Sequence, residues 1–487
     1  MKALKKISYG FFAAVLLLFS GCEDYLKEEV HSQLAPSNFL SSKAGMENVL
    51  ASGYSYALVP FFKKQQIGIQ EWCTDIAYNW RGNWSLDVME FSWDPLVIEN
   101  QSGFGWYGWY SAIRNSNIVL ENVDEADVSQ ATKSLLSSEA RFIRAYSYYQ
   151  MFLNFGPVPL RKSTNDPLKL PRASEEEMLS FIETEVLEII PALPDPGDEP
   201  NYQRAHKGAA RAMLCEFYLN TKQWQKGADM AQDIINMGIY ELYPDYVEMF
   251  KVENEKNSEF IWVIVCDRNP NRAMTNGWMN SAFPLDFQRD PITGLEWQDN
   301  FDAFKDQFSL RDVFVNTFSE DDTRDDNILK SWINKNGDTI VGLGNNNARE
   351  FKYLDVDAGF RAHGNDYPIF RFADVLMLRA EALNELNGPN QVSLDLINMV
   401  RERAGLEDLS LGDFSTKEAL RDHILLERGW ELRSEGKRRL TLIRMGKFIE
   451  NAHDILGISY AQPHHTRFPL PQVAMDANEL LEQNPGY

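Results

Sequence analysis

Residues 207–236 read KGAARAMLCEFYLNTKQWQKGADMAQDIIN, and this stretch predicts two helices packed as a pair. Thr221-Lys222-Gln223 separates the two halves, so the connection between them is a short turn. Helix, short turn and helix, with small residues where the two approach closely, is the pattern of a tetratricopeptide unit. Apolar or small residues recur at the spacing of a helix face in both halves: Ala209, Met213 and Phe217, then Trp224, Ala228, Ala231 and Ile235.

The same helical pattern recurs further along the chain. A second pair is predicted over 372–386 and 392–404, and glycine stops each helix, at Gly388 and Gly405. One helix pair cannot bury its own apolar face, so several must stack. The sequence therefore predicts a mainly α protein built on a tetratricopeptide-type scaffold of helix pairs. A helical fold without repeats is the alternative.

Two long segments depart from the helical pattern. Residues 66–105 and 255–365 are rich in Asn, Asp, Gly and Trp, with short β-like runs such as Phe260–Val265. We expect these segments to form long loops and strand pairs laid onto the helical frame. Binding residues are often found on loops that a rigid scaffold carries.

The N-terminus predicts export and lipid attachment. Lys2, Lys5 and Lys6 precede an apolar run, and Ser20-Gly21-Cys22 follows it. This spacing resembles a lipobox, so residues 1–21 are expected to be a signal peptide and Cys22 the acylated residue. The acidic residues directly after Cys22 resemble a signal for the outer face of the outer membrane. The remaining residues, 22–487, are expected to form one large domain.

Composition limits the partners. The formal net charge is −23, so a polyanion is repelled and nucleic acid is excluded as a partner class. An acidic polysaccharide is disfavoured for the same reason, which favours a neutral one.

The sequence contains no recognisable active site or metal site. Glu427, Glu431 and Glu435 recur four residues apart, and we expect them to form ion pairs with Arg428 and Arg438 instead of catalysing hydrolysis. His464-His465 cannot place both rings on one metal from a regular helix. Gly342-Leu343-Gly344 precedes three asparagines and no helix start, so it is not a nucleotide-binding loop. We expect no catalytic residues, no cofactor and no metal.

Tryptophan is concentrated in the predicted loops. Six of the twelve tryptophans fall between residues 72 and 109. The apolar faces of sugar rings stack on aromatic rings, while sugar hydroxyls need amide, carboxylate or guanidinium partners. Residues 79–84 offer both kinds of group together. The candidate ligand-binding residues of this stretch are Asn79, Trp80, Arg81 and Trp84.

Several sequence blocks, in order along the chain, resemble the SusD/RagB family of outer-membrane nutrient-binding lipoproteins. The blocks lie at Cys22–Leu26, Ala140–Tyr149 with Phe155–Leu160, Tyr367–Leu376, Val400–Leu406, Glu427–Gly436, and Phe468–Pro471 with Gln483–Tyr487.

The resemblance implies a function and a partner. Proteins of this kind capture a glycan at the cell surface without changing it, and loops of the 66–105 region and of the middle of the chain supply an aromatic platform. The resemblance thus adds Trp278, Trp297 and Trp332 as candidate ligand-binding residues. They deliver it to a TonB-dependent β-barrel transporter of the SusC type. Three alternatives remain open: peptide cargo on the same architecture, a glycoside hydrolase, and a scaffold that binds no small ligand.

Overall fold

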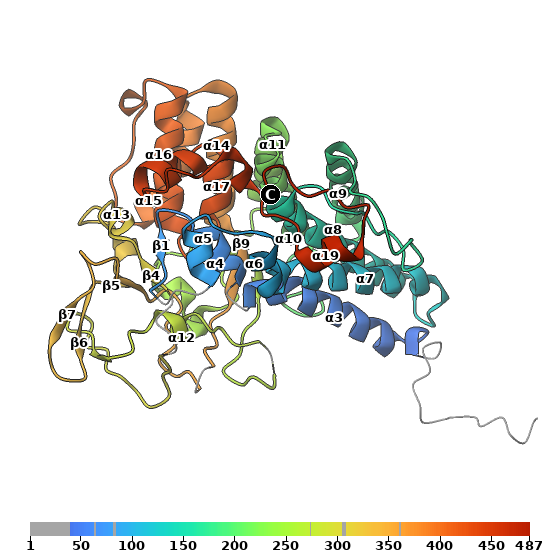
Figure 1. The fold of residues 1–487 in the computed structure, drawn as a ribbon, viewed down its shortest axis with the longest axis horizontal. Coiled ribbons are helices and arrows are strands. Elements are labelled where there is room, and N and C mark those ends of the chain that lie inside the picture. Colours follow the sequence, from blue (N-terminus) through green and yellow to red (C-terminus); the bar gives the residue numbers. More distant parts are fainter. Residues whose placement is uncertain (1–38, 63–64, 81–83, 273, 304–307, 360–361) are drawn as a thin grey trace, which may run out of the picture.

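The computed structural model describes residues 39–487, apart from 63–64, 81–83, 273, 304–307 and 360–361. Helices fill one side of the molecule, and short strands and long connections gather on the other (Figure 1). The fold is mainly α, which confirms the predicted class.

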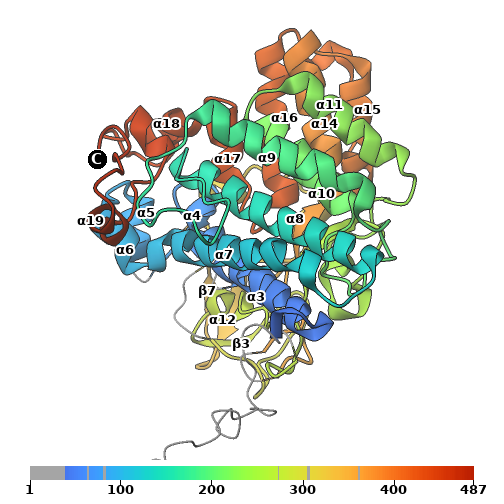
Figure 2. The same cartoon turned by 90° about the vertical axis from the view of Figure 1, so that its right-hand side faces the viewer.

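The long helices stack one on the next. In the first half α3 (Lys43–Phe62) packs on α7 (Trp106–Asn122), α7 on α8 (Gln130–Phe155) and α8 on α9 (Glu175–Ile189). The stack continues through α10 (Lys207–Asn220), α11 (Trp224–Asn236), α14 (Phe372–Asn387), α15 (Gln391–Arg403) and α16 (Lys417–Leu432), as Figure 2 shows. The two predicted helix pairs, α10 with α11 and α14 with α15, are confirmed. Within the described residues, no helix is both long and apolar enough to cross a membrane.

Local signals explain where these helices begin and end. The Ser174 hydroxyl caps α9 by accepting a hydrogen bond from the Glu177 amide at 3.0 Å. Gly388 and Gly405 follow the ends of α14 and α15 with φ of 75° and 80°, a conformation that favours glycine.

The remaining elements are short, and all strand pairs are antiparallel. The predicted loop at 66–105 contains more helix than expected, because α4, α5 and α6 lie within it. The short helices are α4 (Gln65–Glu71), α5 (Trp84–Met89), α6 (Pro95–Asn100), α12 (Met279–Ala282), α13 (Asp312–Val315), α17 (Arg438–Arg444), α18 (Phe448–Glu450) and α19 (Gln472–Ala477). The strands pair as β1 (Ala77–Tyr78) with β4 (Ser309–Leu310), β2 (Phe260–Ile264) with β9 (Tyr367–Arg371), β5 (Ile328–Leu329) with β8 (Arg349–Glu350), and β3 (Phe287–Arg289) with β6 (Ser331–Asn334) and β7 (Thr339–Val341).

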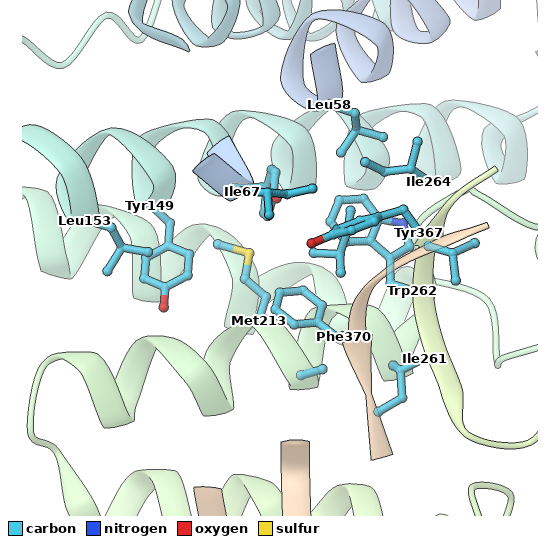
Figure 3. Packing of buried hydrophobic residues seen from close by; sticks show 14 of the residues in the cluster. Leu58, Ile67, Tyr149, Leu153, Met213, Ile261, Trp262, Ile264, Tyr367 and Phe370 are labelled. Carbon is cyan, nitrogen blue, oxygen red and sulfur yellow. The ribbon is translucent and has the colours of Figure 1, made fainter. Parts of the chain in front are cut away.

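The β2–β9 pair joins the helical stack to the loop-rich side through the core. Trp262 of β2 lies edge-on to Phe142 and Tyr146 of α8, with ring centroids 5.0 Å apart in both pairs. Figure 3 shows Trp262 and Phe370 of the two strands beside Met213 of α10. Because these side chains are buried, the strand pair is fixed to the scaffold that carries the loops.

The buried glutamates Glu427, Glu431 and Glu435 form ion pairs, but with other partners than those expected from helix spacing. All three carboxylates are buried, but Arg428 and Arg438 do not pair with them: Arg428 binds Asp374 and Arg438 binds Asp75. The actual partners come from distant segments, which local helix spacing cannot indicate. They are Arg324 for Glu427 (2.7 Å), Arg371 and Arg403 for Glu431 (2.5 Å each), and Arg371 and Lys352 for Glu435 (2.8 and 2.9 Å).

The cysteines of the described chain are all reduced and buried. Cys73, Cys215 and Cys266 are free thiols, and all three are core residues. Burial raises the pKa of Cys73 to about 12, which keeps it protonated. Cys22 lies outside the described residues.

Candidate functional site

An aromatic pair, the partly buried Tyr78 and the exposed Trp80, stands at the end of β1. Tyr78 closes the strand opposite Ser309 of β4, and the chain then leaves the sheet so that Trp80 lies beside Tyr78. The two rings meet edge to face, with centroids 5.2 Å apart and an interplanar angle of 67°. The Trp80 side chain is 47% exposed, which is unusual for so large an apolar group.

A loop from 266 residues further along the chain holds the Trp80 indole in place. The Trp80 Nε1–H donates to the backbone carbonyl of Asn346 at 3.1 Å. Asp312 fixes this loop, because its carboxylate accepts from the amides of Gly344 (2.9 Å) and Asn346 (2.8 Å). The polar edge of the indole is therefore satisfied within the protein, and the ring is oriented before any ligand binds.

Asn345 and Asn346 belong to the loop that binds the Trp80 indole. Asn345 is exposed and donates from its side chain to the Val341 carbonyl at 3.1 Å. The Asn346 side chain accepts from the Asp312 amide at 2.9 Å. We call Tyr78, Trp80, Asn345 and Asn346 the Tyr78–Trp80 platform.

Arg311 packs against the Tyr78 ring of the platform. Its guanidinium lies 5.1 Å from the centroid of the Tyr78 ring and donates to the Ala77 carbonyl at 2.8 Å. Burial lowers the pKa of Arg311 to about 10, against the raising effect of Tyr78 and Asp75. The group stays protonated at neutral pH and places a fixed positive charge behind the Tyr78 ring.

The other predicted residues of the 79–84 segment lie elsewhere or are not described. Asn79 is buried, and its backbone amide donates to the Met89 sulfur at 3.3 Å. Arg81 lies outside the described residues. Trp84 is the first residue of α5, and its side chain also lies outside the described part.

The three tryptophans from the middle of the chain pack inward. Trp278 and Trp332 are each 2% exposed, and their indole N–H groups donate to the Glu350 carbonyl (3.2 Å) and the Asp286 carboxylate (2.9 Å). Trp297 is half-buried against Phe283 and Phe301. In this conformation Trp278 and Trp332 present no ring face to a ligand, so they do not join the platform.

Tyr78, Asn345 and Asn346 were absent from the predicted site. Gly342–Asn347 leads into β8 and not into a helix. The run of three asparagines, Asn345 to Asn347, was the available signal in the sequence. Nothing in the sequence indicates that this run meets Trp80.

The described residues offer no metal centre to compete with this site. Within them, no group of three or more His, Cys, Asp or Glu side chains could hold a metal ion. His464 and His465 lie with their rings 4.0 Å apart, packed with Tyr487 near the C-terminus.

Comparisons with known proteins identify the family. A model described as the SusD family matches residues 236–487, and one described as "Starch-binding associating with outer membrane" matches residues 24–219. The chain is 28% identical to SusD-like protein P25 of Formosa agariphila, over 97% of this chain and 98% of that protein. It is 23% identical to the starch-binding protein SusD of Bacteroides thetaiotaomicron, over 85% and 83%.

A solved structure shows the same fold. The laminarin-binding SusD-like protein superposes with a TM-score of 0.77 at 19% identity, covering 92% of this chain and all of the other. Because the SusD model matches more than half of the sequence and this fold agrees with it, the chain belongs to the SusD family.

Proposed function

We propose that this protein binds an oligo- or polysaccharide at the cell surface through the Tyr78–Trp80 platform. The observation that supports this proposal most directly is the half-exposed Trp80 indole. Its N–H is hydrogen-bonded within the protein, while its ring remains accessible. Relatives named as starch-binding and laminarin-binding support a glycan ligand.

The chemistry of the platform suits a sugar. A stacked ring that buries roughly 60 Å² of apolar sugar surface contributes about 1.5 kcal/mol. The asparagine amides beside Trp80 offer both donors and acceptors to sugar hydroxyls. One or two stacked rings, less the ordering cost, give weak binding with a Kd on the order of μM to mM. Weak binding suits capture followed by release.

A neutral glycan is the proposed class. The formal net charge of −23 repels an acidic polymer at long range, and the partly buried Arg311 guanidinium lies against the Tyr78 ring and donates to the Ala77 carbonyl.

Delivery to a SusC-type TonB-dependent transporter and anchoring through Cys22 complete the proposal. Family membership and the second model's description, which includes association with the outer membrane, support the location.

Cys22→Ala should leave the protein folded and release it from membranes. Recovery of the wild-type protein entirely in the soluble fraction would contradict the anchor.

We also propose that the protein does not hydrolyse its ligand. The carboxylates that most resemble a catalytic set, Glu427, Glu431 and Glu435, are buried in ion pairs with arginine or lysine and do not face a ligand.

A binding screen tests the proposal. The chain without its signal and Cys22 would be titrated with neutral glycans, acidic glycans and peptides, and the products would be assayed for reducing ends. We expect saturable binding of a neutral glycan that leaves its chain length unchanged. Saturable binding of peptides alone would establish the peptide alternative. New reducing ends above a heat-treated control would establish a hydrolase.

A further inference from the structure

A cavity of about 580 Å³ lies on the loop-rich side of the molecule and shares no residue with the Tyr78–Trp80 platform. Its size falls within the range of small-molecule sites in proteins. Four segments contribute to its wall: 247–253, 290–295, 326–330 and 351–356.

Most of the wall is apolar. Ile328 and Leu329 of β5 and Phe351 after β8 are nearly fully buried, and Leu295 and Leu354 are half-buried at the cavity. An apolar body would gain free energy by leaving water for this surface.

One polar group of the wall has an unused hydrogen-bonding capacity. Asn327 is 7% exposed, and its Oδ1 accepts a hydrogen bond from the Arg433 guanidinium, which fixes the orientation of the amide. Within the described part of the chain, the Asn327 Nδ2 is buried and has no hydrogen-bond partner. A buried donor of this kind is stabilised by a ligand that brings an oxygen acceptor.

The charges at the cavity disfavour an anion. Its three lysines are already paired: Lys251 with Glu248 at 2.5 Å, Lys330 with Asp325, and Lys352 with Glu435 at 2.9 Å. Four acids also line it, Glu253, Asp290, Asp326 and Asp355. A carboxylate ligand would meet this negative surface without a cation of its own to bind.

We propose that this cavity is a second binding site, which takes an uncharged aryl or acyl group bearing an oxygen acceptor for Asn327. The cavity shares no residue with the Tyr78–Trp80 platform, so a negative result at either site leaves the other proposal unaffected.

Photolabelling of the folded, soluble chain tests this site. The probe is methyl 4-azidobenzoate, an uncharged aryl ester, and 4-azidobenzoate is its anionic counterpart. We expect saturable labelling by the ester on peptides from the four segments above, competed by methyl benzoate. The acid should label these peptides at least about tenfold less. Unsaturable labelling, labelling on other segments, or equal labelling by ester and acid would overturn the proposal.

A pair of variants tests the role of Asn327. Asn327→Asp keeps the oxygen that faces Arg433 and replaces the unused donor with an acceptor, so ester labelling should fall about tenfold. Asn236→Asp makes the same change of charge at the exposed end of α11 and should leave labelling unchanged. Equal labelling of the two variants would contradict the role of Asn327. If Asn327→Asp does not fold, the ester and acid comparison on the wild-type protein still decides the proposal.

Discussion

At the scale of single residues, buried ion pairs fix the C-terminal helices to the rest of the chain. Arg371, at the end of β9, binds Glu431 of α16 at 2.5 Å and Glu259 before β2 at 2.7 Å. Burial alone would raise the pKa of Glu431, but Arg403, Arg371 and Arg324 hold it well below its usual range. The carboxylate therefore stays ionised and joins three segments that are far apart in sequence.

Glu431→Gln should destabilise the protein by ~3–5 kcal/mol, because it leaves the arginine charges buried without their partner. Glu188 also pairs with an arginine, Arg141, but its side chain is 59% exposed. Glu188→Gln should therefore lower the free energy of unfolding by less than about 1 kcal/mol. Chemical denaturation of both variants measures the difference. A fully stable Glu431→Gln protein that had lost ligand binding would contradict the structural role.

Asp366 predicts a dependence of stability on pH. It is buried, and its carboxylate accepts from the Cys266 amide at 2.8 Å. Burial, with a smaller contribution from Glu255, raises the pKa of Asp366 to about 8, above the unfolded value of about 3.9. The folded state thus holds this proton more tightly than the unfolded state. The stabilisation is complete below about pH 4 and is lost as the pH rises through 8.

Asp366→Asn imitates the protonated form and keeps the acceptor for Cys266. Between pH 5 and pH 9 the wild-type Tm should therefore fall by ~2–4 °C more than the Tm of the variant. Thermal melts of both proteins across this range make the comparison. Parallel curves would show that Asp366 does not titrate in this way.

Residue composition alone could not separate exposed from buried tryptophans. Trp80 and Trp278 both follow Asn-containing, loop-like sequence, yet one is exposed and the other is core. Phe308 packs over Trp278 with a centroid distance of 4.2 Å, and this contact depends on tertiary structure. Trp80 is therefore exposed, whereas Trp278 and Trp332, which were candidates for the same role, are buried.

At the scale of elements, the helices were predictable and the connections were not. Helical periodicity and glycine stops are local, so the pairs α10–α11 and α14–α15 lie within a residue or two of their expected bounds. Strand pairing is not local: β1 meets β4 across more than 200 residues, and this pairing brings Arg311 to Tyr78.

Gly227 of α11 tests how closely that helix must approach α10. A Cβ added there would lie 2.3 Å from a methyl group of Leu219, which is fully buried and cannot move without repacking. Gly227→Ala should therefore destabilise the protein by ~1–3 kcal/mol, although alanine favours a helix.

Gly53→Ala in α3 is the matched control for this prediction. Its added Cβ has no neighbour nearer than 3.7 Å, so higher helix propensity should stabilise the protein by ~0.5–1 kcal/mol. Chemical denaturation compares the two variants. Stabilisation of both would contradict the close α10–α11 contact.

At the scale of the whole molecule, the helical scaffold and the proposed ligand surface are separate parts. The helical stack fixes the β2–β9 pair, while the exposed Trp80 follows β1 and is held by a loop from the middle of the chain. This division lets loop sequences change without loss of the fold.

The most direct test of glycan binding is the variant Trp80→Ala. Its affinity for a neutral glycan from the screen and its Tm would be measured on the same preparation. The variant should bind about tenfold more weakly, the loss of one stacked ring or ~1–2 kcal/mol, with little change in Tm. Tyr460→Ala removes another ring that is 53% exposed and should keep wild-type affinity. Full affinity in Trp80→Ala would contradict the Tyr78–Trp80 platform, as would unfolding of the variant, since a ring required for the core typically costs ~3–5 kcal/mol when truncated.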